Sequence, residues 1–447
     1  MKRYLAKISL VLLVLLLLAI PATAVEEEFT YTVDLQKSYQ EMEGFGGSIA
    51  WYENFLTAHP NKEELYDIIF KDLGLDILRF QNWYGKRTQV AQYEEEIVRE
   101  AERSLGHPLK ILITSWTPLK RLKSNDNLED GGTLIKENGE YAYDEFASYW
   151  HNSLLAYERA GIKADYISIQ NEPDYEADWN CCLFAPTETD ELAGYDKALE
   201  AVYEKLQQEM ADPPLLVGPE TIGIGYLEFY KYLEEINTDH IYAIAHHLYR
   251  GGEHSRPDSF NYSLRQLNEK YPDKPKFQTE FERGENGFNT AWLIHNSLVE
   301  GNINAYLYWD LIWNNGGLVF LENAYFKTQW RTEKGYYKTD EYYALQHYSK
   351  FIGEGYTRVE ISGTNNKLKL SAFISPAEDE LVIVGLNTLL VEKDIKLNIP
   401  GFTYSSSEVY SSVFPGEEKR FHDEGPLSAD NTISIPAYSV VTVRLID

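Results

Sequence analysis

The chain has 447 residues, of which 44 % are apolar, so it is long enough for a large core and for more than one average domain. Its formal net charge is −29, which excludes nucleic acid and anionic lipid as its main partners. The only two cysteines, Cys181 and Cys182, are adjacent and match no zinc-ligand spacing. They could form a strained disulfide outside the cell or remain as two buried thiols.

The first 24 residues have the pattern of a signal peptide. Basic residues precede an apolar run, 8–20, which is followed by Pro21-Ala-Thr-Ala24. A membrane anchor is the alternative, but this run is shorter than the roughly 20 residues that span a bilayer. The pattern therefore predicts that residues 1–24 are a removed leader, and that the protein is secreted, extracellular and free of membrane contact after cleavage.

Residues 43–347 alternate short apolar runs with amphipathic helical patterns. The longest helical patterns cover Tyr143–Ala160 and Leu192–Met210. Eight βα units in about 300 residues favour a (β/α)₈ TIM barrel. The expected strands are, in chain order, Gly44–Ile49, Ile77–Phe80, Ile111–Ser115, Tyr166–Gln170, Leu215–Gly218, Ile241–His247, Phe277–Thr279 and Ala305–Trp309.

Residues 348–447 have a different texture, with strand-like runs separated by Gly, Pro, Asn and Ser turns. We expect an attached β-sandwich side domain here, packed rigidly because no Pro-, Gly- or Ser-rich linker precedes it. An extended segment within residues 25–42, Phe29–Leu35, could add an amino-terminal strand to it. The expected strands of the side domain are Leu368–Ile374, Leu381–Leu386, Ile395–Ile399, Glu408–Ser412 and Thr432–Ile446.

Two polar strand ends carry the candidate catalytic residues. Tyr166-Ile-Ser-Ile-Gln-Asn-Glu-Pro173 contains Glu172, and Glu280 follows 108 residues later in Lys276-Phe-Gln-Thr-Glu-Phe-Glu282. Side-chain alternation places both glutamates on the polar face, at the barrel end where active sites lie. A retaining glycosidase needs two such carboxylates, one as acid/base and one as nucleophile. A solvated surface charge is the alternative for either residue, and Glu282 competes with Glu280 because it has the same parity.

Other side chains at predicted strand ends are candidates for orienting these carboxylates. His247 and Tyr249 share one face of their strand and could hold a carboxylate by hydrogen bonding, whereas His246 fits a buried core histidine. Arg79 could pair with a catalytic carboxylate or with a purely structural one.

Tryptophans near strand ends are the candidate sugar-binding residues. Flat sugar faces lie well on aromatic rings, and the polar edge of indole reaches hydroxyl groups. Core packing is the alternative for each ring. The candidates are Trp51, Trp116, Trp309 and Trp313, and Trp83 and Trp179 lie in similar loops.

Several motifs follow one another in a fixed order over nearly the whole mature chain. They include Gly44-Phe-Gly-Gly47, Ser168-Ile-Gln-Asn-Glu-Pro-Asp-Tyr175, His247-Leu-Tyr249, Ala305-Tyr-Leu-Tyr-Trp309 and Ile435-Pro-Ala-Tyr-Ser-Val440. The ordered set resembles glycoside hydrolase family 30, and most closely its bacterial xylanases. The Gln-Asn-Glu-Pro element alone indicates only the wider superfamily of related barrels.

This resemblance implies a (β/α)₈ barrel with a β-sandwich built from both chain ends. It also implies a retaining double displacement on a β-linked sugar chain, with Glu172 as acid/base and Glu280 as nucleophile. Asn171 would bind the 2-hydroxyl of the sugar. The implied partner is a polysaccharide, xylan or xylo-oligosaccharides, and no metal or other cofactor is implied. We expect the enzyme to act as a monomer.

One region departs from the pattern of the glucuronoxylan-specific members. Their loop after the last barrel strand carries an arginine and a Tyr-Gly-Pro turn that grip a glucuronate branch, whereas Trp309-Asp-Leu-Ile-Trp-Asn-Asn-Gly-Gly317 has no arginine. We therefore expect hydrolysis of β-1,4-xylan, endo-xylanase-like, without dependence on that branch. The alternatives are an exo-acting mode, a relative acting on β-1,6-glucan, galactan or a glucosyl lipid, and a polysaccharide-binding protein without catalysis.

Overall fold

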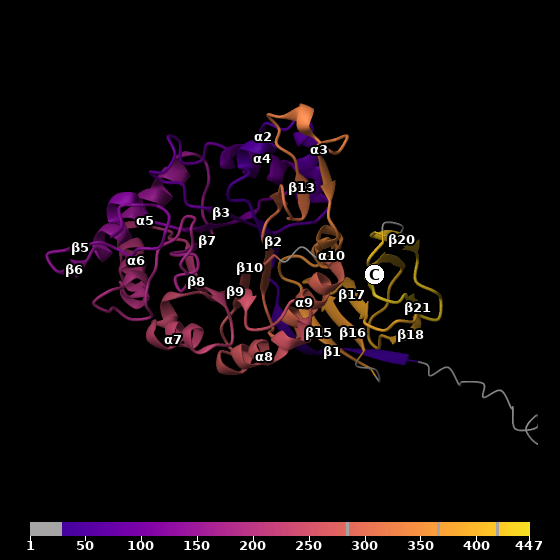
Figure 1. The fold of residues 1–447 in the computed structure, drawn as a ribbon. Helices are drawn as coiled ribbons and strands as arrows, with labels where there is room; N and C mark the ends of the chain where they lie inside the picture. The colour runs from indigo at the N-terminus through magenta and orange to yellow at the C-terminus, as the bar shows by residue number, and fades with distance from the viewer. Residues whose placement is uncertain (1–28, 283–285, 364–366, 417–419) are drawn as a thin grey trace, which may run out of the picture.

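The structure, a computed structural model, describes residues 29–282, 286–363, 367–416 and 420–447. A barrel and a sheet-rich unit lie side by side (Figure 1). The predicted leader, residues 1–24, lies outside the described residues. Within these ranges no helix combines the length and the apolar character needed to cross a bilayer.

Eight parallel strands form a closed barrel, which confirms the (β/α)₈ prediction. Each predicted apolar run overlaps one of them. Around the barrel they are β10 (Lys276–Glu280), β11 (Ala305–Tyr308), β2 (Gly44–Ser48), β3 (Ile77–Gln81), β4 (Lys110–Thr114), β7 (Tyr166–Ser168), β8 (Leu215–Gly223) and β9 (Ala243–Arg250).

Alternation along the strands sorts the apolar side chains of the barrel into two layers. On β4, Ile111 and Ile113 join the large core under the helices, whereas Leu112 belongs to a smaller cluster with Phe277 and Leu307 from other strands. This second cluster fills the barrel interior, so the barrel is a packed core with chemistry confined to its rim.

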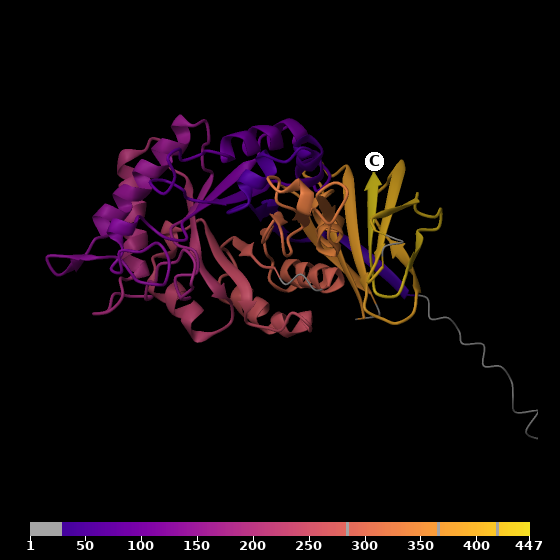
Figure 2. The ribbon, with the colours of Figure 1, turned by 45° about the horizontal axis from the view of Figure 1, so that its top comes forward.

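Helices surround the barrel, as Figures 1 and 2 show. Helix α4 illustrates how the sequence specifies them. It has glutamates in its first turn, buries Ile97 and Ala101 on one face, and ends at Gly106 with a positive φ of 82°. The helices are α2 (Glu53–Thr57), α3 (Lys62–Tyr66), α4 (Glu94–Leu105), α5 (Tyr143–Arg159), α6 (Tyr195–Glu209), α7 (Leu227–Glu235), α8 (Asn261–Lys270), α9 (Gly287–Glu300) and α10 (Asp340–Ser349).

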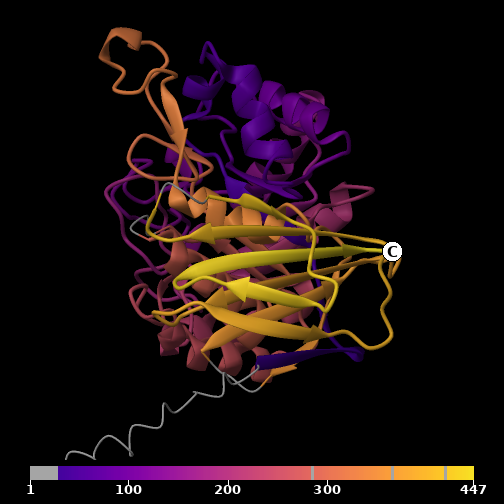
Figure 3. The same cartoon turned by 90° about the vertical axis from the view of Figure 1, so that its right-hand side faces the viewer.

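The second unit is a mixed, mostly antiparallel sheet (Figure 3). Its strands run in the order β20 (His422–Gly425), β19 (Ser406–Val413), β22 (Ser439–Ile446), β17 (Glu380–Asn387), β16 (Leu368–Ile374), β15 (Thr357–Gly363), β1 (Phe29–Glu41), β18 (Lys393–Asn398) and β21 (Thr432–Ile435). The sheet folds over its own apolar core, which includes Val33, Ile383 and Leu445, and this gives the predicted β-sandwich architecture. The predicted run Thr432–Ile446 is interrupted and forms two strands, and β15 and β20 were not predicted.

The strand β1 from the amino-terminal segment lies inside this sheet. It pairs antiparallel with β15 and parallel with β18. Its buried residue Tyr31 lies opposite Gly363, where a side chain would collide with the tyrosine ring. The carboxy-terminal strands are therefore joined through a strand from the other end of the chain.

A flap that the sequence did not predict lies between β11 and α10. It contains β12 (Ile312–Trp313), β13 (Val319–Leu321) and β14 (Tyr336–Lys338), and it projects at the top of Figure 3 in orange. The other short pair, β5 (Lys136–Glu137) and β6 (Glu140–Tyr141), forms a hairpin before α5. Cys181 and Cys182 are buried free thiols, so the buried-thiol alternative is confirmed.

Candidate active site

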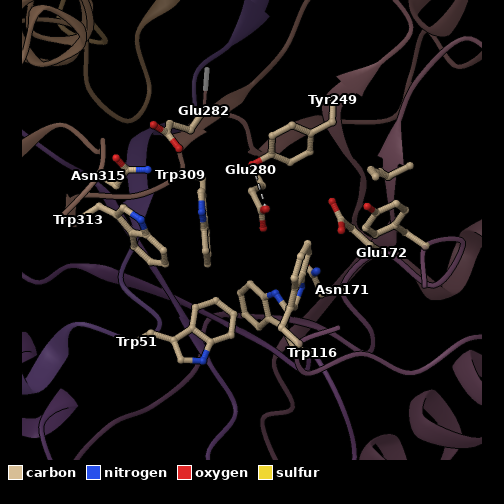
Figure 4. Close-up of a pocket in the computed structure, with 13 residues that line it drawn as sticks. Trp51, Trp116, Asn171, Glu172, Tyr249, Glu280, Glu282, Trp309, Trp313 and Asn315 are labelled. Carbon is tan, nitrogen blue, oxygen red and sulfur yellow. Dashed lines mark hydrogen bonds between the residues drawn. The ribbon is translucent and has the colours of Figure 1, made fainter. Parts of the chain in front are cut away.

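A cavity of about 730 Å³ opens at the carboxyl ends of the barrel strands (Figure 4). Eight of the ten predicted site residues line it, and the other two, Arg79 and His247, are fully buried and contact the carboxylates that line it. The lining residues are Trp51, Trp116, Asn171, Glu172, Tyr175, Trp179, Ile222, Tyr249, Glu280, Glu282, Trp309, Trp313 and Asn315.

Glu172 and Glu280 face one another across this cavity (Figure 4). Glu280 is the last residue of β10, and Glu172 follows β7 in a left-handed conformation, with φ of 44°. One oxygen of each carboxylate and one nitrogen of His247 lie within 4.8 Å of one another. This separation fits the spacing of about 5–5.5 Å of retaining glycosidases and is well below the 6.5–9.5 Å of inverting ones.

Arg79 connects the two sides of the site from below. Its guanidinium donates to Glu280 Oε2 at 2.7 Å and to Asn171 Oδ1 at 2.7 Å, and it lies 4.4 Å from the centre of the Trp116 ring. Tyr249 donates to the other oxygen of Glu280 at 3.1 Å. Two donors therefore hold Glu280 in one orientation, and Arg79 also fixes the Asn171 amide.

His247 binds the other carboxylate. Its Nδ1 lies 2.8 Å from Glu172 Oε1, and its Nε2 lies 3.8 Å from both Glu220 and Glu280. His246 points to the opposite face of β9, where its ring lies near Phe229 of α7. Side-chain alternation on this strand thus separates a site histidine from a core histidine.

Glu220 is a further residue of this site that the sequence analysis missed. It is fully buried, lies 3.1 Å from Arg79 and has a φ of 59°. The predicted strand stopped at Gly218, whereas β8 continues to Gly223. A usable signal was present, because Gly218-Pro-Glu220 places a proline-flanked glutamate after an apolar strand, as happens at Glu172.

Two buried cations face three carboxylates in this site. Although burial opposes their charges, Arg79 and His247 lower the pKa of Glu220 to about 2, and the carboxylates, Glu280 foremost, raise the pKa of His247 to about 10. Burial, reinforced by the charge of Glu172, raises the pKa of Glu280, while His247 and Arg79 oppose this shift. These opposing shifts couple the two cations and the carboxylates into one network of charges.

Four tryptophans, Trp51, Trp116, Trp309 and Trp313, form a cluster that lines the cavity. Trp51 lies 5.4 Å from Trp116 and 5.5 Å from Trp309, measured between ring centres, and Trp313 lies 6.0 Å from Trp309. Trp179 lies beside Tyr175 among the lining residues and is 45 % exposed. Trp83 is not in the cavity, because its indole nitrogen donates to Glu53.

Glu172, His247 and Glu280 are also residue types that bind metal ions, and their closeness raises this possibility. The guanidinium of Arg79, however, already places a full positive charge 2.7 Å from Glu280. A second cation would be repelled at this short range. The charge distribution therefore fits acid–base chemistry better than metal binding.

Known proteins with similar sequences and folds include glycoside hydrolases. No protein-family model matches the chain. The glucuronoxylanase XynC of Bacillus subtilis strain 168 is 24 % identical over 391 residues, 82 % of this chain and 80 % of the relative. The lysosomal acid glucosylceramidase of Mus musculus is 21 % identical over 450 residues, 88 % of this chain and 84 % of the relative.

Solved structures share the combination of barrel and sandwich. The family 30 subfamily 8 xylanase Xyn30A of Clostridium acetobutylicum superposes with a TM-score of 0.69 at 22 % identity, over 94 % of this chain and 100 % of that protein. The resemblance that the motifs indicated is therefore confirmed: the chain is similar in sequence to a bacterial glucuronoxylanase and in fold to a family 30 xylanase.

Proposed function

We propose that the protein is a retaining glycosidase that cleaves β-1,4-xylan internally. The observation that carries the proposal is the Glu172–Glu280 pair, whose nearest oxygens lie within 4.8 Å. One sugar-sized gap between two carboxylates is what double displacement requires.

In the first step Glu280 attacks the anomeric carbon while Glu172 protonates the leaving oxygen. Water then hydrolyses the glycosyl-enzyme, with Glu172 acting as base. Glu280 accepts two hydrogen bonds, from Arg79 and Tyr249, which favour its anionic form and suit the role of nucleophile.

Asn171 is positioned to bind the sugar at the reacting centre. Because its Oδ1 accepts from Arg79, its amide nitrogen is left to donate to the 2-hydroxyl. Such a bond strengthens as the oxocarbenium-like transition state forms.

The cavity wall also supports independence from a glucuronate branch. Among the described lining residues none is Lys, Arg or His, and Glu282 adds a third carboxylate to Glu172 and Glu280. An anionic branch would gain no ion pair with these residues and would meet negative charge.

The decisive variant is Glu280→Gln. We expect its turnover on linear xylan to fall by about a thousandfold or more, because the amide cannot act as nucleophile, while its melting temperature changes little. Release of reducing ends and the anomeric configuration of the first product measure both claims. Near-normal turnover, or an inverted product, would overturn the assignment, and Glu282→Gln is the matched control because Glu282 lines the same cavity.

A glycosidase acting on another β-linked sugar is the second candidate, since the mouse relative is named a glucosylceramidase. Equal molar amounts of linear xylan, β-1,6-glucan, β-galactan and a β-glucosyl lipid separate these activities. Turnover only on the lipid or the glucan would make that compound the substrate in place of xylan, and removal of xylan from solution without its hydrolysis would indicate a binding protein.

We further propose that residues 1–24 direct secretion. The barrel then spans residues 43–347, the side domain combines residues 25–42 with 348–447, and the protein is a monomer.

A further inference from the structure

A line of partly exposed aromatic side chains leads out of the cavity along the barrel mouth. It consists of Trp313, Tyr52, Phe55 and Tyr325, and we call it the aromatic strip. Its successive ring centres are 4.4, 5.2 and 6.1 Å apart. Trp313 itself lines the cavity, so the strip begins inside the site and ends at Tyr325, which is 60 % exposed.

Folding of α2 does not explain these rings. The helix already buries Leu56 and Glu53 completely. Phe55, in contrast, and Tyr52, which precedes the helix, keep part of their surface in solvent. Tyr325 comes from the flap, about 270 residues later in the chain, and its hydroxyl donates to the Asn54 backbone oxygen. Aromatic surface is thus assembled from two distant segments and left uncovered, as in a ligand-binding surface.

The chemistry beside the strip fits a sugar chain. Tyr52 donates to the Asn314 side chain at 3.0 Å, and Asn314 and Asn315 are both exposed. Flat rings with neighbouring amides suit a ligand that has apolar C–H faces and hydroxyl edges. The four strip residues carry no formal charge at neutral pH, which favours a neutral ligand.

The position of the aromatic strip relative to the two carboxylates determines which part of the substrate it contacts. Trp309 and Trp313 lie on one side of Glu280, and Glu172 lies on the other (Figure 4). Under the proposed function Glu172 protonates the leaving oxygen, so the leaving part of the substrate lies on its side. The strip must then contact the part of the chain that stays bound to Glu280.

We propose that the aromatic strip binds further sugar units of the same neutral β-linked chain, beyond the unit that reacts, on the non-leaving side. This inference rests on the proposed function and specifies the path of the sugar chain across the protein surface. It makes Phe55 and Tyr325 determinants of substrate length, with no contact to the reacting atoms.

The test is the choice of bond in labelled xylo-oligosaccharides. In linear chains of three to six units with a reducing-end label, the Phe55→Ala and Tyr325→Ala variants should lose about fivefold in kcat/KM on the longest chain and little on the shortest. Cleavage of the longest chain should also move towards its non-reducing end, because holding several units there no longer helps. The matched control is Tyr262→Ala, an exposed tyrosine on α8 that is 65 % exposed.

Unchanged length dependence and cleavage positions in both strip variants would overturn the proposal. Binding separates this failure from a failure of the proposed function. Calorimetric titration of Glu280→Gln with the six-unit chain should give weaker affinity when Phe55→Ala is added, whether or not wild-type enzyme turns it over. Equal affinities would reject the strip, whereas weaker affinity with an inactive wild type would reject only the hydrolysis.

Discussion

His247 and its charged partners make the site costly to assemble. Arg79, His247 and Glu220 have no exposed side-chain surface, and Glu172 and Glu220 both adopt left-handed backbone conformations that non-glycine residues rarely occupy. Buried charges are tolerated only when each has a partner, and strained residues persist only where surrounding structure holds them. The cluster therefore exchanges stability for fixed carboxylate orientation.

The charge on His247 predicts how stability depends on pH. Its folded pKa of about 10 lies above the ordinary value of 6.5, so its contribution is complete below pH 6.5 and disappears as the pH rises through 10. Between these limits the free energy of unfolding of the wild type should fall relative to that of His247→Asn, by up to about 1.4 kcal/mol per pH unit. Urea unfolding at several pH values measures this difference.

His246→Asn is the control for that measurement. Burial lowers the pKa of His246 to about 3, so this side chain is neutral in the folded state throughout that window, and neutral in the unfolded state once the pH is about one unit above 6.5. Its variant should lose stability without changing the pH slope. If His247→Asn kept the wild-type slope, the imidazole would not be charged in the folded protein.

Side-chain alternation explains how far the site could be predicted from the sequence. Glu172 and His247 lie at the ends of strands whose apolar partners mark the outer face, so their direction follows from parity. Glu280 does not follow this rule, because Phe277 lies in the interior cluster and a register shift between Gln278 and Glu280 interrupts the alternation before the glutamate. Glu220 was missed because β8 continues past Pro219 with a register shift, and no periodic pattern predicts such an extension. The contact between its carboxylate and Arg79 depends on the tertiary structure, so the sequence does not predict it.

Among the elements, β1 connects two groups of strands within the sandwich. Phe29, Tyr31 and Val33 are buried in its core, and the strand separates β15 from β18. The junction with the barrel is also tightly packed. His347 of α10 is fully buried and lies 2.9 Å from Thr442 and 2.8 Å from Ser412 of the sandwich.

This packing predicts that damage to β1 is felt in the barrel. Val33→Ala should cost about 2 kcal/mol, because it opens a cavity in a fully packed core. All nine tryptophans lie between Trp51 and Trp330, and of these Trp292 lies 5.2 Å from Lys369 of β16, so tryptophan fluorescence reports mainly barrel unfolding. A lower denaturation midpoint by fluorescence would show that the two units unfold together.

Thr30→Ala, on the exposed face of the same strand, should leave that midpoint unchanged. If Val33→Ala lowered a circular-dichroism midpoint but not the fluorescence midpoint, the sandwich would unfold independently.

The sequence predicted this strand from the extended segment Phe29–Leu35. Its neighbours in the sheet could not be deduced, since strand order depends on long-range pairing. The flap was missed because its strands have only two or three residues.

For the molecule as a whole, the net charge of −29 should act on charged substrates. We expect kcat/KM on a glucuronate-bearing xylo-oligosaccharide, relative to an unbranched one of equal length, to rise as salt increases from about 10 to 300 mM, because the Debye length shrinks. Initial rates measure this ratio. A ratio that falls with salt would reveal a cationic contact with the branch.

The architecture was predictable because it repeats. Eight apolar runs separated by helical patterns leave few topologies other than a closed barrel, and the change to strand and turn signals near residue 350 marks the second unit. No repeating sequence pattern predicts the side-chain contacts between the two units, such as those of His347.

The placement of β1 sets a sequence of events in synthesis. A ribosome delivers this strand before any of its hydrogen-bonding neighbours, since β15 begins at Thr357 and β18 at Lys393. Until then its edges lack partners, and exposed edges invite pairing with other chains. During synthesis β1 therefore stays unpaired until some three hundred further residues have been added. We expect chaperones to protect the nascent chain more than the completed protein.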